Sequence, residues 1–105
     1  MSADSLERPV AHVAVRNDDA IVTVSGELDL SNIEVLATPL GMALDAGMGV
    51  VLDLSGLSFI DLFGVRLIET TAAGLRRRGR SLHVIDAQPQ IRRVFFLTGA
   101  THLLI

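Results

Sequence analysis

Apolar residues change their spacing several times along this chain, and this change limits the folds open to it more than any other feature. Residues 11–16 alternate loosely between apolar and polar, and residues 20–24 form a β-branched run. Asn17, Asp18 and Asp19 lie between these two segments and are typical of a tight turn. We therefore expect a hairpin of two strands, after which the apolar spacing becomes helical.

A first helix is predicted from about residue 32 to residue 46. Its apolar face would consist of Ile33, Leu36, Ala37, Leu40 and Leu44. Ser31 and Glu34 fit a capping box, with Ser31 as the N-cap residue. A proline inside a helix removes a hydrogen bond and clashes with the preceding turn, so Pro39 predicts a kink or a restart of the helix at Thr38 and Pro39.

The rest of the chain continues the alternation of strands and helices. Residues 50–54 form a nearly continuous apolar run, which is typical of a central strand covered on both faces. The further elements that we expect are a helix from Gly64 to about Gly79, a strand at 81–85, a helix that begins at Pro89, and a short edge strand at 102–105. This order predicts a mixed α/β fold, with four to five strands in a mixed sheet and three to four helices packed against it.

Length and composition favour one domain. With 105 residues, of which 50% are hydrophobic, the chain can bury a single core. We assign residues 1–9 to an N-terminal tail and residues 10–105 to the domain. The chain has no cysteine, which rules out disulfides and cysteine chemistry and suits a reducing compartment. It has neither a signal peptide nor a long apolar run, so we expect a cytoplasmic protein without direct membrane insertion.

Charge is unevenly distributed along the sequence. Residues 1–61 hold ten acidic residues against two arginines, a charge of −8, whereas residues 62–105 hold seven arginines against two acidic residues, a charge of +5. Such a dipolar chain can steer association with a charged protein partner. The cluster Arg76, Arg77, Arg78 and Arg80 is interpreted as a solvated helix end. Because the net charge is −3 and all four aromatic residues are phenylalanine, we expect no nucleic-acid partner.

No motif for catalysis is present. His12, His83 and His102 are far apart in sequence and lack the spacing of metal ligands. The glycines form neither a dinucleotide fingerprint nor a P-loop, and no nucleophile elbow surrounds Ser25 or Ser55. We therefore expect a protein that is not an enzyme and that uses neither a metal nor a cofactor.

Four segments, in this order, resemble one protein family. They are residues 26–29, residues 51–61 with Gly64 and Val65, residues 79–85, and residues 91–99. In the second segment, that family has an aspartate, two hydroxyl residues and a glycine in a row. Asp61 and Gly64 stand at the first and the last of these four positions. From about residue 10 to residue 105 the chain resembles the STAS domain of anti-sigma factor antagonists, which implies a STAS-type fold.

The resemblance implies a regulatory, non-enzymatic role in partner switching. Family members of this kind capture an anti-sigma factor, a serine kinase of the histidine-kinase-like ATPase type, and so free the sigma factor. Phosphorylation of the serine just before the glycine reverses the capture. This chain has Leu62 and Phe63 in place of the two hydroxyl residues, with Phe63 at the phosphoserine position. We therefore expect no phosphorylation there, and Ser58 is the nearest alternative.

The predicted partner-binding residues are Asp29, Asp61, Leu62, Phe63 and Gly64. Simpler roles exist for several of them: Asp61 can be the N-cap of the second helix, and Asp29 can be a turn residue. Leu62 and Phe63 can be buried under the loop, or they can form an exposed apolar anchor for a partner.

Other functions remain open at this stage. The chain can also be a scaffold, or an accessory STAS subunit of a signalling complex or a membrane transporter. A homodimer is compatible with either role. A small-ligand sensor is less favoured, because the chain has few aromatic residues and no phosphate-binding loop.

Overall fold

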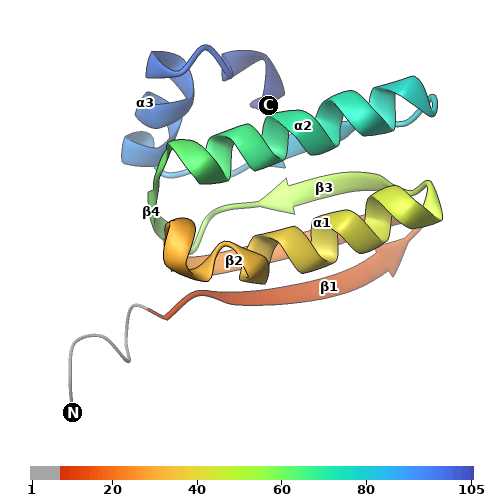
Figure 1. The fold of residues 1–105 in the computed structure, drawn as a ribbon, viewed down its shortest axis with the longest axis horizontal. Helices are drawn as coiled ribbons and strands as arrows, with labels where there is room; N and C mark the ends of the chain where they lie inside the picture. Colours follow the sequence, from red (N-terminus) through yellow and green to blue (C-terminus); the bar gives the residue numbers. More distant parts are fainter. Residues whose placement is uncertain (1–7) are drawn as a thin grey trace.

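The computed structural model describes residues 8–105, which form a five-stranded mixed sheet and three α-helices (Figure 1). The strands are β1 (Val10–Arg16), β2 (Asp19–Leu28), β3 (Gly49–Asp53), β4 (Leu57–Ile60) and β5 (Leu82–Ile85). The helices are α1 (Glu34–Ala46), α2 (Leu62–Arg77) and α3 (Pro89–Leu97), with two short 3-10 helices, η2 (Leu30–Asn32) and η3 (Thr101–Leu103). The expected mixed α/β fold is confirmed. Most of the expected tail, residues 1–7, lies outside the described residues.

Strand β2 is the centre of the sheet. The strands run in the order β1-β2-β3-β5, and β4 pairs with the far end of β2. Only the β1–β2 pair is antiparallel, as the predicted hairpin requires, and the other pairs are parallel. The stretch of β2 that pairs with β3 ends at Thr23, and a register shift between Gly26 and Glu27 lies within the stretch that pairs with β4. Gly26 has a φ of 91°, which a residue with a Cβ rarely adopts.

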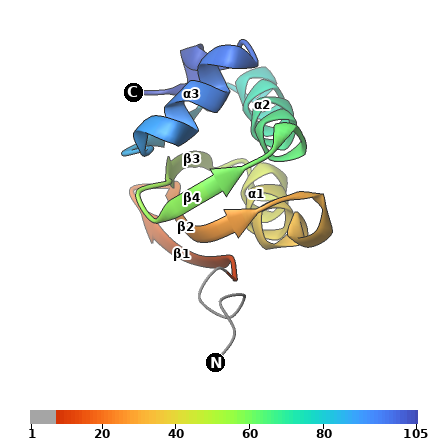
Figure 2. The same ribbon diagram turned by 90° about the vertical axis from the view of Figure 1, so that its left-hand side faces the viewer.

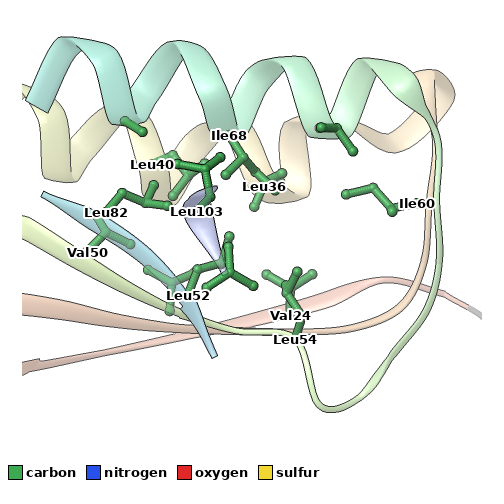
Figure 3. Close-up of a cluster of buried hydrophobic side chains, with 14 of the residues drawn as sticks. Val24, Leu36, Leu40, Val50, Leu52, Leu54, Ile60, Ile68, Leu82 and Leu103 are labelled. Carbon is green, nitrogen blue, oxygen red and sulfur yellow. The ribbon is translucent and has the colours of Figure 1, made fainter. Parts of the chain in front are cut away.

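Helices α1 and α2 lie side by side on the same face of the sheet, and α3 lies beside β4 (Figure 2). The core lies between the sheet and the helices, and both contribute to it. Its residues include Val24, Leu36, Leu40, Val50, Leu52, Ile68 and Leu82 (Figure 3). In β3, Val50 and Leu52 are buried whereas Val51 and Asp53 are half-buried. The predicted central position of β3 is confirmed, since it lies between β2 and β5, and none of its residues is exposed, although one face is covered less completely than the other.

The predicted capping box of Ser31 and Glu34 is wrong. Asp29 caps η2 instead, and its carboxylate accepts a hydrogen bond from the backbone N–H of Ser31 at 2.9 Å. The side chain of Asn32 completes the box by accepting from the backbone N–H of Asp29 at 2.9 Å. Helix α1 begins only at Glu34, and Ile33 precedes it without a side-chain cap. The chain thus makes one turn of 3-10 helix before the α-helix starts.

Two further expectations differ from the structure. Helix α1 runs through Pro39 from Glu34 to Ala46, so of the two predicted effects of Pro39, a kink or a restart, the restart at Thr38 and Pro39 does not occur. The predicted edge strand at 102–105 is instead the end of η3 followed by a single β-bridge between Val84 and Leu104. The backbone N–H of Ile105 donates to Val84 at 2.9 Å, which is enough to hold the chain end against β5 without a strand.

The arginine cluster lies at the end of α2, as expected. Arg76, Arg77 and Arg78 are exposed, and Gly79 follows them with the positive φ typical of a helix end. Arg78 donates to the carbonyl of Leu44, and Arg80 donates to the carbonyl of Asp18 at 3.0 Å. Part of the cluster therefore ties the helix end to neighbouring segments.

Candidate functional site

The N-terminus of α2 is built around Asp61. Asp61 is the N-cap residue, and its carboxylate accepts a hydrogen bond from the backbone N–H of Gly64 at 3.1 Å. This bond satisfies one of the N–H groups that the first turn of a helix leaves free. Gly64 is required by packing, because a Cβ atom there would lie 2.6 Å from Cγ1 of Ile60. The predicted capping role of Asp61 is thus present in the structure.

Asp61 also joins two loops that are far apart in sequence. Its second carboxylate oxygen accepts a hydrogen bond from the backbone N–H of Leu30 at 3.1 Å. The backbone N–H of Asp61 donates to the carbonyl of Leu28 at 3.3 Å, in continuation of the β2–β4 pairing. Since Asp29 caps η2 directly beside Leu30, the two predicted aspartates lie on adjoining loops. Both carboxylates are occupied in holding the backbone.

Exposed apolar side chains lie on both sides of Asp61 in the sequence. Leu62 is 47% exposed and Phe63 is 55% exposed, so the interpretation that they are buried under the loop is wrong. Phe59 on β4 and Leu30 on η2 are also exposed. We call Leu30, Phe59, Leu62 and Phe63 the tip surface. A set of exposed apolar side chains of this kind is typical of a protein-binding surface.

Two members of the tip surface, Leu30 and Phe59, are not among the partner-binding residues predicted from the sequence. Phe59 lies next to Ile60 in a short, mostly apolar run that resembles a buried strand, and Leu30 adjoins a turn signal. Alternation of apolar and polar residues was the only available signal, and it is too weak over the four residues of β4. Pairing of β4 with β2 is what orients Phe59 outward.

Ser58 is exposed on β4, two residues before Ile60. Its hydroxyl donates to the carbonyl of Gly26 at 3.2 Å, and its carbonyl is 3.5 Å from the side-chain nitrogen of Gln90. Gln88 similarly donates to the carbonyl of Ser55 at 2.8 Å. The start of α3 therefore holds the loop between β3 and β4, and Ser58 lies in a strand rather than at a helix N-terminus.

Histidine and acidic side chains do not gather into a metal site in the described part of the chain. His12, His83 and His102 are all exposed on separate elements. None of the helices within residues 8–105 is both long and apolar enough to cross a membrane.

Replacing Asp61 with alanine should lower the free energy of unfolding by about 1–2 kcal/mol, because the N-cap acceptor of α2 is lost. Asp61→Asn keeps an oxygen that can accept from the N–H of Gly64 but loses the acceptor for the N–H of Leu30, so it should cost less than Asp61→Ala without being neutral. Urea unfolding of both variants measures the difference. Equal losses in the two variants would mean that the charge of Asp61 or its bond to the N–H of Leu30, and not its capping bond to Gly64, stabilises the helix start.

The family was identified by comparison with known proteins. Residues 11–104 match the STAS domain family. BtrV of Bordetella bronchiseptica is 32% identical over 80 residues, which span 75% of this chain and 69% of BtrV. The anti-sigma-B factor antagonist of Staphylococcus aureus is 29% identical over 86 residues, which span 79% of this chain and 78% of the relative.

Solved structures agree on the fold. An anti-sigma factor antagonist from Mycobacterium paratuberculosis superposes with a TM-score of 0.82 at 24% identity, over 93% of this chain and 84% of that one. The family model covers nearly all of the described residues, and the mixed sheet is the one expected of that family. Both observations lead to the same conclusion. This chain belongs to the STAS domain family and is an anti-sigma factor antagonist-like protein.

Proposed function

We propose that this protein captures an anti-sigma factor through its tip surface and does so without a phosphorylation switch at the start of α2. The observation that carries the proposal is the exposure of Leu62 and Phe63 on the first turn of a helix whose N-cap is fixed. An aromatic side chain on a backbone that is already fixed loses little conformational freedom when it binds, because it has only two rotatable bonds. The partner would be a serine kinase of the histidine-kinase-like ATPase type, as the family resemblance implies.

The position of Phe63 explains why capture would be constitutive. A phosphate at a helix N-terminus is favoured by the free N–H groups and by the helix dipole, yet it would repel an apolar or acidic partner surface. Phe63 occupies the position that corresponds to the family's phosphoserine, and it has no hydroxyl group. The tip surface would therefore keep its apolar character in the presence of an active kinase.

Incubation with ATP and the cognate anti-sigma kinase should leave residues 59–65 without phosphate, and the complex should persist. None of these residues has a hydroxyl side chain. Phosphate mapping by mass spectrometry, together with size-exclusion chromatography of the mixture, measures both outcomes. Stoichiometric phosphate on Ser58 that dissolves the complex would contradict constitutive capture. Failure to bind any cognate anti-sigma factor would contradict the function itself and would favour a scaffold or accessory role.

A further inference from the structure

Strand β1 has an open edge. It lies at the end of the strand order, and within residues 8–105 its only strand partner is β2. Asn17 and Asp18 have φ values of 52° and 69°, so they form a type I′ turn, whose flanking residues Arg16 and Asp19 make a hydrogen-bonded pair. Because hydrogen-bonded pairs alternate along an antiparallel ladder, the backbone groups of Ala11, Val13 and Val15 point to the open edge.

The side chains of these three residues line an apolar groove. They lie opposite Val24, Val22 and Ala20, and therefore on the face that carries α1. Together with Val35, Met42 and Met48, they line a groove of about 670 Å³ between β1 and α1. Val13 is 54% exposed, and Val15 and Met42 are exposed too. The same three residues thus offer free backbone groups and uncovered apolar side chains.

Open edges in natural proteins normally carry protection against pairing, such as lysine, an inward charge or a bulge. Strand β1 has the sequence VAHVAVR, without lysine or an acidic residue, and its pairing with β2 has no register shift. Pro9 precedes it and lacks an N–H group, but it lies beyond the central part of the edge. The edge is therefore suited to pairing with another strand.

We propose that the occupant of this edge is a second copy of the chain, paired antiparallel with β1 about a two-fold axis at Val13. In this register Val13 lies opposite Val13 of the second copy, and Ala11 lies opposite Val15. Backbone groups that point outward on one copy then meet those of the other, and the two sheets become continuous. The two apolar grooves adjoin across the axis.

Charge complementarity favours a second copy in this register. Arg8 is exposed, and it lies opposite Asp18 of the second copy, which is exposed at the hairpin turn. The two-fold axis makes this pairing occur twice, once at each end of an apolar centre. A shift of two residues in either direction loses both pairs. The tip surface shares no residue with the groove, so this interface leaves Leu62 and Phe63 available.

Sedimentation equilibrium of the full chain over a range of concentrations tests the proposal. The wild type should form a dimer, and Val13→Lys should weaken it by about tenfold or more, because two like charges would face each other at the axis. Val13→Asp should weaken it similarly. An equimolar mixture of the two variants should restore the dimer, since lysine and aspartate then lie opposite each other.

Leu97→Lys is the matched control, because Leu97 is 67% exposed on α3 and is not part of the groove. It should leave the dimer unchanged. Circular dichroism verifies that each variant is folded. A wild type that stays monomeric at high concentration would overturn the proposal, whether or not another protein uses the edge. A dimer that survives Val13→Lys, or a mixture of folded variants that stays monomeric, would also overturn it.

Discussion

Phe63→Ser should weaken capture of the anti-sigma factor by about 2 kcal/mol or more while leaving the free energy of unfolding nearly unchanged. The side chain of Phe63 is 55% exposed, so its truncation leaves no cavity in the core. Its place on the first turn of α2 is fixed by Asp61 and Gly64, so the loss would arise at the contact itself. Isothermal titration with the cognate anti-sigma factor and thermal unfolding of the same variant measure the two quantities.

Phe96→Ser is the matched control for this experiment. Phe96 is 71% exposed on α3 and lies outside the tip surface, so its replacement removes an equal apolar side chain elsewhere. Binding should remain as in the wild type. If both variants weaken capture equally, the partner contacts a wider surface than the tip. If Phe63→Ser folds and binds as the wild type does, the tip surface is not the anchor.

The serine variant has a second use. It places a hydroxyl group at the position that we propose corresponds to the family's phosphoserine, on a helix N-terminus that can accommodate a phosphate. Phosphorylation by the cognate kinase, followed by release of the partner, would show that this chain still presents the surface that the kinase recognises. A folded variant that binds the kinase but is never phosphorylated would contradict the assigned correspondence between Phe63 and the phosphoserine.

Phe95→Ala should lower the free energy of unfolding by about 3–5 kcal/mol. Phe95 is fully buried and belongs to the hydrophobic core, although it lies on the shortest of the three α-helices. Its removal would leave a cavity that its neighbours fill only partly. Urea unfolding provides the measurement, with a folded baseline verified by circular dichroism.

The neighbouring residue provides a stringent comparison. Phe96→Ala should change the free energy of unfolding by less than about 0.5 kcal/mol, because an exposed side chain removes little apolar surface from water. Similar losses at Phe95 and Phe96 would mean that α3 is not docked on the core in the orientation described. A small loss at Phe95 alone would mean that the core closes around the gap.

Most elements follow from local patterns in the sequence. The hairpin of β1 and β2 depends on alternation and on a turn of Asn17 and Asp18, both of which act between near neighbours. The amphipathic period of α2 and its end at Gly79 are equally local. The N-terminal cap of α1 was predicted wrongly because two patterns compete there. Ser31 with Glu34 and Asp29 with Asn32 both fit a helix start.

Long-range pairing decided between these two caps. The hydrogen bond from Leu30 to Asp61 and the pairing of β4 with β2 hold the segment before α1, so the first turn becomes a 3-10 helix capped by Asp29. Such contacts join residues about thirty positions apart, which a window of a few residues cannot register. The single bridge between Val84 and Leu104, which stands in place of the predicted edge strand, also depends on a contact between residues that are far apart in the sequence.

For the candidate site, the sequence alone determined the Asp61–Gly64 spacing and the absence of a hydroxyl group at residues 62 and 63. Whether Phe63 is core or surface was decided only by the tertiary structure. Phe63 and Phe95 are chemically identical side chains on helices, yet one is 55% exposed and the other is fully buried. Burial depends on which elements pack against a position, and those elements come from distant parts of the chain.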